Sequence, residues 1–174
     1  MGSAFVVFIM LATALTSAAE KTKWNVDLDL ILENVSFSPP NIFYLQGDII
    51  TINVTLRAYY FTAENVTLQA STDSIILASK LVTIPENQTV QTDLYISLTG
   101  LLGSKNIIVK IDPYNNITES SETNNERSTT IEVLDIYSAL DYLDTKIQNY
   151  PNDYFIHPPK QQKNALHNKI NAMK

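Results

Sequence analysis

The chain has 174 residues, 45% of them hydrophobic, and a formal net charge of −6. This length allows one domain of ordinary size with a small appendage, and the apolar content excludes a disordered chain. The chain has no cysteine, which excludes disulfides, thiolate metal sites, cysteine nucleophiles and a cysteine lipid anchor. Residues 20–134 carry 14 acids and 7 bases, so this part of the chain is expected to repel nucleic acid and anionic lipid.

The N-terminus has the pattern of an export signal. A mostly apolar run extends from Ala4 to Leu15, and the small residues Ser17 and Ala19 suit cleavage before Glu20. The run is shorter than the ~20 apolar residues of a membrane-spanning helix. We therefore expect residues 1–19 to be a signal peptide, with no membrane span in the mature chain. An uncleaved anchor or a buried first helix is the alternative.

The middle of the chain alternates apolar and polar residues with the period of β-strands. In residues 50–57, for example, Ile50, Ile52, Val54 and Leu56 share one face. Turn residues separate such segments at short intervals, as in antiparallel sandwiches. The expected strands are 26–32, 50–57, 66–70, 75–77, 80–84, 90–98, 105–111 and 127–134. This pattern predicts a mainly β fold, an immunoglobulin-like antiparallel β-sandwich of about seven to eight strands over residues 20–134.

Two short segments interrupt this alternation. Ser36 to Asn41, with the sequence SFSPPN, predicts a turn after the first strand. Tyr59-Tyr60-Phe61 predicts the point where a strand leaves the sheet, with one or two of these aromatic rings over the core. The alternative is an exposed aromatic contact patch.

After Leu134 the apolar period changes from that of a strand to that of a helix. Asp135 is placed to cap a first helix, Pro151 to end it and Pro159 to begin a second. The apolar residues at helical spacing are Ile136, Leu140, Leu143 and Ile147, and then Leu166, Ile170 and Met173. Residues 135–174 are therefore expected to form a C-terminal α-helical hairpin.

Five Asn-x-Ser/Thr sequons support export, because such triplets accept N-linked glycans in secreted proteins. The candidate glycosylation sites are Asn34, Asn53, Asn65, Asn87 and Asn116. On the strands, the sequon residues alternate with apolar ones and so fall on the polar face. The alternative is that polar strand faces simply contain Asn and Thr.

The segment Asp112 to Asn125 (DPYNNITESSETNN) joins two expected strands and is rich in acids and asparagine. Its oxygen atoms are of the type that Ca²⁺ binds in sets of 6–8. The candidate ligands are Asp112, Asn115, Glu119, Glu122 and Asn124. The alternative is a turn in which these side chains bond to nearby backbone amides while the acids stay solvated.

Nothing in the sequence indicates an enzyme. His157 and His167 are the only histidines, and neither has a nearby acid in sequence to orient it. The glycines Gly47, Gly100 and Gly103 form no phosphate loop, and no Gly-x-Ser-x-Gly segment is present.

The segments Ile111-Asp112-Pro113, Ile117-Thr118-Glu119 and Glu122-Thr123-Asn124-Asn125 form a long ordered pattern. Residues 26–134 resemble, most strongly in this pattern, a CARDB module, an immunoglobulin-like domain of prokaryotic secreted and surface proteins associated with cell adhesion. Further matches are Asp27-Leu28, Gly47-Asp48 and Ala63 to Leu68, whereas Arg57 to Phe61 replaces the family's usual Asn-x-Gly turn. Residues 160–172 resemble a helical segment appended to secreted repeat proteins of archaea and bacteria.

The resemblance and the residue patterns together predict a secreted or cell-surface adhesion or scaffolding module. We expect it to be non-catalytic and to bind a surface protein or glycan, with Ca²⁺ as its one candidate cofactor. The alternative function is a carbohydrate- or substrate-targeting accessory module for an exported enzyme.

Overall fold

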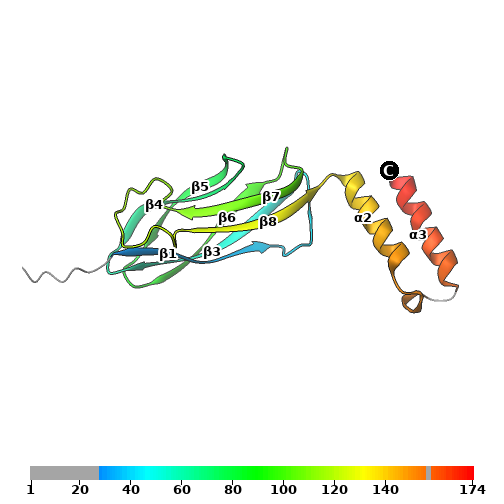
Figure 1. Cartoon of the computed structure of the whole chain (residues 1–174), viewed down its shortest axis with the longest axis horizontal. Helices are drawn as coiled ribbons and strands as arrows, with labels where there is room; N and C mark the ends of the chain where they lie inside the picture. Colours follow the sequence, from blue (N-terminus) through cyan, green and yellow to red (C-terminus); the bar gives the residue numbers. More distant parts are fainter. Residues whose placement is uncertain (1–27, 156–157) are drawn as a thin grey trace, which may run out of the picture.

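The computed structural model describes residues 28–155 and 158–174. The predicted signal peptide, the first residues of the first expected strand, and His157 lie outside the described residues. Two β-sheets pack face to face, and two helices lie beyond one end of the sandwich (Figure 1). The predicted fold class, an immunoglobulin-like β-sandwich with a C-terminal helical hairpin, is confirmed.

The described residues form eight strands, which lie in two sheets. The strands are β1 (Asp29–Ser38), β2 (Tyr44–Leu45), β3 (Ile49–Tyr59), β4 (Ala63–Thr72), β5 (Ile75–Ile84), β6 (Thr89–Ser97), β7 (Gly103–Ile111) and β8 (Glu126–Leu134). One sheet has the order β1-β3-β6 and the other the order β2-β8-β7-β4-β5. All neighbours are antiparallel except β2 and β8, which are parallel. This arrangement makes β1 and β2 edge strands on the same side of the sandwich.

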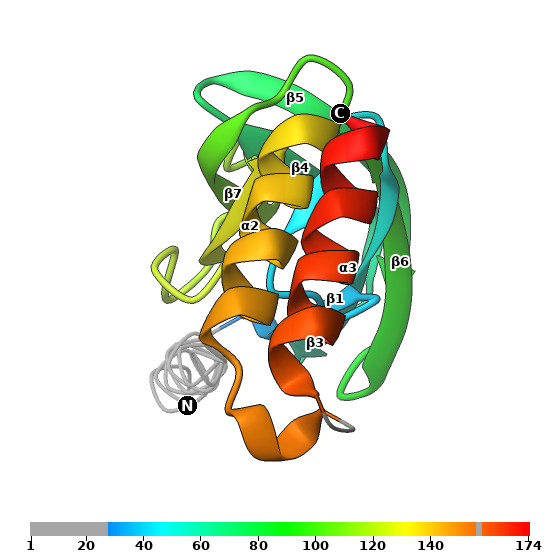
Figure 2. The same ribbon diagram turned by 90° about the vertical axis from the view of Figure 1, so that its right-hand side faces the viewer.

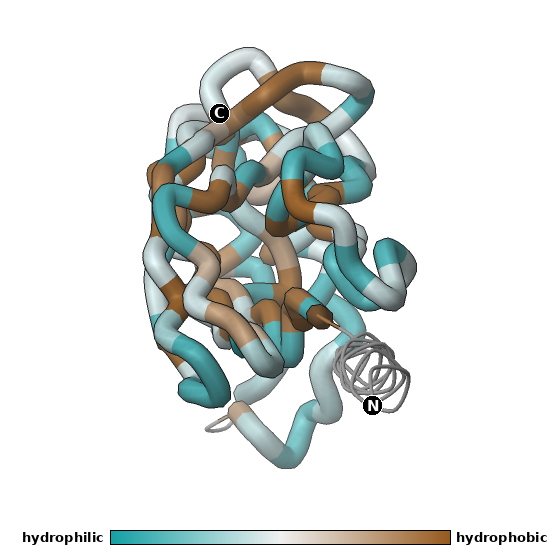
Figure 3. The backbone as a smooth tube through the Cα atoms, turned by 90° about the vertical axis from the view of Figure 1, so that its left-hand side faces the viewer, coloured by the Kyte–Doolittle hydropathy of each residue, from teal (hydrophilic) through white to brown (hydrophobic). Residues whose placement is uncertain are grey.

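The core lies between the two sheets and is built from the apolar residues of each alternating strand. In β3, Ile50, Ile52, Val54 and Leu56 are all buried, as their shared phase predicted. Figure 3 shows apolar and polar residues alternating along the strands. Complete burial of a Leu or Ile side chain stabilises a fold by about 1.5–3 kcal/mol. The buried residues of the alternating strands together therefore contribute most of the stability of the sandwich.

A β-bulge in β1 explains why the sequence pattern located only the first part of this strand. The pairing with β3 shifts between Leu32 and Asn34, so one extra residue enters β1 there. Leu30 is buried before the bulge, while Val35 and Phe37 pack against the core after it. The strand continues to Ser38 and so includes part of the segment that was predicted to be a turn. The alternation in the sequence ends earlier because the bulge changes its phase.

Two other strand boundaries differ from the prediction. The expected strands 75–77 and 80–84 are one continuous strand, β5. The two-residue strand β2 was not predicted, because two residues carry no periodicity. The strand β3 ends at Tyr59 as expected, and Tyr60 then adopts a left-handed conformation with φ 65°.

The C-terminal residues form helices α2 (Ile136–Asn149) and α3 (Pro159–Met173), with a short 3₁₀ turn, η1 (Asn152–Tyr154), between them. Asp135 caps α2 by accepting a hydrogen bond from the Ser138 amide at 2.8 Å, which confirms the predicted start of the helix. Figure 2 shows α2 and α3 side by side in front of the sandwich. Tyr142 of α2 packs edge-on against Phe43, with ring centroids 5.2 Å apart.

Candidate functional site

The loop from Asp112 to Asn125 joins β7 to β8 at the end of the sandwich far from the helices (Figure 1). Asp112 is 2% exposed and has a left-handed backbone with φ 46°. Its carboxylate accepts hydrogen bonds from the amides of Asn116 (3.1 Å) and Ile117 (2.7 Å). Its own amide donates to the Thr67 carbonyl of β4 at 2.9 Å. Both oxygens of Asp112 therefore hold the loop's own backbone.

Glu119 connects this loop to two other parts of the sandwich. One carboxylate oxygen accepts a hydrogen bond from the Leu30 amide of β1, and the other accepts one from Asn125 Nδ2 at 2.7 Å. Asn125 is fully buried, and its Nδ2 also lies 3.3 Å from Oε2 of Glu122. Burial raises the pKa of the Glu119 carboxyl above its ordinary value of 4.5, while the hydrogen bonds from Leu30 and Asn125 oppose the rise.

The second half of the loop runs along β1 and pairs with its outer edge. The Ser120 amide donates to the Leu28 carbonyl at 2.8 Å, and the Leu32 amide donates to the Asn124 carbonyl at 3.1 Å. Asn124 Nδ2 also donates to both carboxylate oxygens of Asp29, at 3.0 and 3.2 Å. The loop thus covers the first part of the β1 edge as an additional strand would.

The five predicted calcium ligands fall into separate sets of contacts. Glu119 and Glu122 meet at Asn125 Nδ2, whereas Asp112 contacts backbone amides, and Asn115 donates its own amide to the Asp112 carbonyl at 3.0 Å. Among residues 28–155 and 158–174, no three His, Asp or Glu side chains are arranged to hold a metal ion. The calcium site stays a prediction. Asp112 bonds to backbone amides as the alternative expects, but its side chain is buried and not solvated.

The strand β2 covers the β8 edge at the opposite end of the sandwich. Tyr44 and Leu45 pair in parallel with Val133 and Leu134. The hydroxyl of the buried Tyr44 donates to the Pro39 carbonyl at 2.8 Å, which fixes the segment between β1 and β2.

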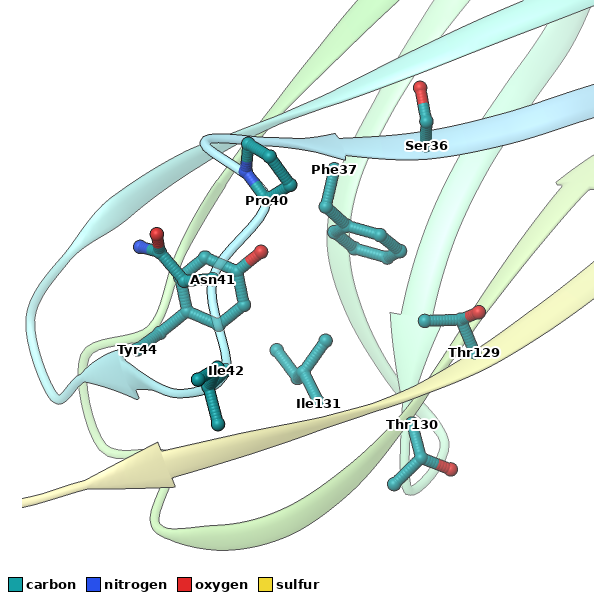
Figure 4. A pocket seen from close by; sticks show the side chains of 9 residues that line it. All are labelled: Ser36, Phe37, Pro40, Asn41, Ile42, Tyr44, Thr129, Thr130 and Ile131. Carbon is teal, nitrogen blue, oxygen red and sulfur yellow. The ribbon is translucent and has the colours of Figure 1, made fainter. Parts of the chain in front are cut away.

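Between these two covered ends, the side of the sandwich is open. A groove of about 460 Å³ lies between the last part of β1 and the middle of β8. Figure 4 shows Phe37 and Ile131 pointing toward each other across it, with Tyr44 and Ile42 at one end. Ile42 is 82% exposed. The groove is therefore an apolar channel that is accessible from outside.

Both strands that border the groove have a free backbone edge there. Residues 34–38 of β1 pair with β3 alone, and residues 126–132 of β8 pair with β7 alone. Within the described part of the chain, no other backbone hydrogen bond reaches these two stretches on their outer edge. Unpaired strand edges are templates for the addition of another strand.

All five predicted glycosylation sites are exposed: Asn34, Asn53, Asn65, Asn87 and Asn116. Asn34 and Asn53 lie on the outer face of the three-stranded sheet. Asn65 and Asn87 have left-handed backbones, and Asn116 lies in the β7–β8 loop. Exposure is the condition that a glycan requires, and glycosylation itself stays a prediction.

His167 has an acidic partner that lies far from it in the sequence. Nδ1 of His167 lies 2.7 Å from the carboxylate of Asp144, which comes from the other helix of the hairpin. The two residues are too far apart in sequence for spacing to indicate this contact. Asn171 contacts the other ring nitrogen at 2.9 Å, so His167 joins α2 to α3.

In the described part of the chain, no helix has the length and apolarity that crossing a membrane requires.

Comparison with protein-family models and with curated proteins finds no match. Among solved structures, the chain is similar to the CARDB domain of a Pyrococcus furiosus protein. The solution structure of that domain has a TM-score of 0.52 and 14% identity, with 63% of this chain and 97% of the domain covered. Its crystal structure, in complex with di-metal ions, has a TM-score of 0.53 and 13% identity, with 62% and 90% covered.

A third similar structure is a domain of a Methanosarcina acetivorans protein. It has a TM-score of 0.48 and 20% identity, with 63% of this chain and 93% of the domain covered. The two packed, largely antiparallel sheets define the chain as an immunoglobulin-like sandwich. More particularly, its fold is that of CARDB domains, as the resemblance in sequence implied.

The sequence analysis missed two kinds of residue in this region. Asp29 and Asn125 complete the loop network, and neither had an assigned role in the sequence analysis. Phe37, Tyr44 and Ile131 line the groove, and no periodic signal could have brought them together. The apolar Phe37 within a predicted turn was the one indication of a continuing strand.

Proposed function

We propose that this chain is a secreted or cell-surface adhesion or scaffolding module that binds an extended segment of a protein partner. The segment lies in the groove between β1 and β8 and pairs with their free edges. The observation that carries this proposal is the juxtaposition of an open apolar groove with two unpaired strand edges. The signal-peptide pattern, the exposed sequons and the CARDB-like fold support a location outside the cell.

The chain itself already uses strand addition on both sides of the groove. The β7–β8 loop bonds to β1 through Leu28 and Leu32, and β2 bonds to β8 through Val133 and Leu134. The same edges continue between these contacts without a partner. In strand addition, backbone hydrogen bonds contribute affinity, and pockets for alternate side chains contribute specificity. Phe37 and Ile131 would form such a pocket.

No step of this function requires catalysis. The groove is lined by aliphatic, aromatic and hydroxyl side chains and the amide of Asn41, and it contains no carboxylate or histidine among its lining residues. We therefore propose a binding role, in which the rigid sandwich presents the groove and the loop network keeps its far end closed.

A selection of extended peptides from a displayed random library tests this proposal. We expect the selected peptides to carry β-branched or aromatic residues at alternate positions and to bind with a Kd of about 1–100 µM, as small interfaces do. Thr129 lies on the groove side of β8, so Thr129→Glu places a charge in the apolar channel and should weaken binding at least about tenfold.

Ser128 supplies a matched control because it precedes Thr129 but does not line the groove. The variant Ser128→Glu carries the same charge change and should keep the parent affinity. Equal losses in the two variants, or selected peptides that resist Thr129→Glu, would overturn the groove as the binding site.

A further inference from the structure

The outer face of the three-stranded sheet carries a compact field of polar side chains, whereas the groove is lined mainly by apolar ones. In the register of β1, β3 and β6, Ser36 lies opposite Asn53, which lies opposite Asp93. The next row contains Asn34, Thr55 and Gln91. These six side chains line a pocket of about 260 Å³.

The bulge in β1 creates this field. Without the extra residue before Asn34, the polar residues Asn34 and Ser36 would point into the core instead of outward, because strand side chains alternate between faces. The bulge therefore both turns Phe37 toward the core and completes the polar rows. Amide side chains are depleted in strands, so their gathering on three neighbouring strands is not explained by strand preference.

The amide groups of the pocket are available to a ligand. Within the described residues, the side chains of Asn34, Asn53 and Gln91 form no hydrogen bond with the rest of the chain. No lysine or arginine lines the pocket, and Asp93 is the one acid. This lining suits a neutral ligand with many hydroxyl groups, because each amide both donates and accepts and a carboxylate accepts from two hydroxyls.

Tyr95 adds an apolar surface beside the polar rows. It follows Asp93 by two residues on β6, pairs with Thr51 and is 65% exposed. An exposed aromatic ring next to hydrogen-bonding groups provides both parts that a sugar ring requires: a flat surface for its C–H face and polar partners for its hydroxyls.

We propose that this pocket binds a single neutral saccharide unit, with Asn53, Gln91 and Asp93 bonding to its hydroxyls and Tyr95 packing against its ring. This inference goes beyond the proposed function. Ser36 lines both the groove and this pocket, whereas Asn53, Gln91 and Asp93 line the pocket alone. The sugar is a free saccharide or the end of a surrounding glycan. An N-linked sugar on Asn34 or Asn53 would start inside the same pocket and would therefore block it.

Two-dimensional NMR titration of protein from a host without N-glycosylation tests the proposal, with glucose, galactose, mannose and N-acetylglucosamine as probes. We expect at least one sugar to shift the backbone amide resonances of residues 34–36, 53–55 and 91–95. Sugar concentrations up to about 50 mM suffice, because they exceed the millimolar Kd of a weak site. Asp93→Ala and Tyr95→Ala should each weaken that binding at least about fivefold. The exposed Glu132 of the other sheet provides the control, and Glu132→Ala should leave binding unchanged.

The absence of shifts with all four sugars would overturn the proposal, as would an equal loss in Asp93→Ala and Glu132→Ala. Asp93 and Tyr95 lie on the outer face of the sheet, so the variants are expected to fold, and a thermal melt checks this. Protein glycosylated at Asn53 should lose the shifts, whereas Thr129→Glu, which tests the groove, should retain them. The two sites are thereby tested independently.

Discussion

Asn125 donates a hydrogen bond of 2.7 Å from its side chain to the carboxylate of Glu119, across the base of the β7–β8 loop. The other carboxylate oxygen of Glu119 accepts from the backbone of β1 at Leu30. A fully buried amide thus joins the loop, β8 and the edge strand of the opposite sheet. The polar segment that marks the CARDB resemblance closes one end of the sandwich's open side.

Removal of the Asn125 side chain should therefore destabilise the sandwich. Asn125→Ala leaves the Glu119 and Glu122 carboxylates without their shared donor, and a lost bond of this kind costs about 1–3 kcal/mol. Urea denaturation measures the change in the free energy of unfolding. The exposed Asn116 of the same loop is the control, because its backbone is not left-handed, and Asn116→Ala should cost less than about 1 kcal/mol. Similar costs for the two variants would contradict the role of Asn125.

Asp112 is predicted to order the first half of the loop. Asp112→Ala removes the acceptor of the Asn116 and Ile117 amides and places a residue with a Cβ and no compensating side chain at φ 46°. We expect a loss of about 1–3 kcal/mol in the free energy of unfolding. Asp112→Asn retains one acceptor oxygen and the tolerance for this backbone, so its loss should be smaller. The prediction fails if Asn is as damaging as Ala.

Glu119 should make stability depend on pH in the weakly acidic range. Because burial raises its pKa in the folded state, the folded protein binds a proton more tightly than the unfolded chain does. The resulting stabilisation is present below the ordinary value of 4.5 and is lost as the pH rises through the raised pKa. Glu119→Gln removes this group. As the pH rises from 4, the melting temperature should fall more in the parent protein than in the variant. Parallel plots of melting temperature against pH for the two proteins would contradict this.

The calcium prediction now concerns Glu119 and Glu122, the two candidate acids that share a contact. If the loop binds Ca²⁺, the ion should raise the melting temperature of the parent protein, because a ligand that binds only the folded state stabilises it. Glu122→Gln should reduce this shift. A melting temperature that does not respond to Ca²⁺ would withdraw the prediction and leave the hydrogen-bond network as the loop's role.

The contact between Tyr142 and Phe43 should control how firmly the helical hairpin docks on the sandwich. Tyr142→Ala removes the ring that packs edge-on against Phe43 at 5.2 Å. Such ring pairs contribute about 0.5–1.5 kcal/mol, so the variant should be cleaved faster by protease between β8 and α2. Tyr137, which is also exposed on α2 and forms no ring pair among the described residues, supplies the control variant Tyr137→Ala.

Much of this fold could be predicted because its strands alternate in phase. The burial of Ile107, Val109 and Ile111 follows from their spacing, and so does the helix that begins after Asp135. The same reasoning failed at the β1 bulge, where one extra residue reverses the phase. A regular alternation identifies only an unbroken strand, so Phe37, which follows the bulge, was predicted to lie in a turn.

The site was less predictable because its contacts join residues that are distant in sequence. Asn124 reaches Asp29, and Asp144 reaches His167, through the packing of elements whose order in space no local pattern encodes. The acidic loop was found by its composition, yet composition could not distinguish ligands from hydrogen-bond acceptors. The groove required the topology, since it exists only where two edge stretches from different sheets remain unpaired.

Amide hydrogen exchange of the complex with a selected peptide tests the central claim most directly. If an extended segment adds to the open side of the sandwich, exchange should slow in residues 34–38 and 126–132, whose outer edges lack a strand partner along most of their length. Residues 112–125 and the hairpin should be unchanged. Slowed exchange confined to the loop or to the hairpin, with both edges unaffected, would contradict the account.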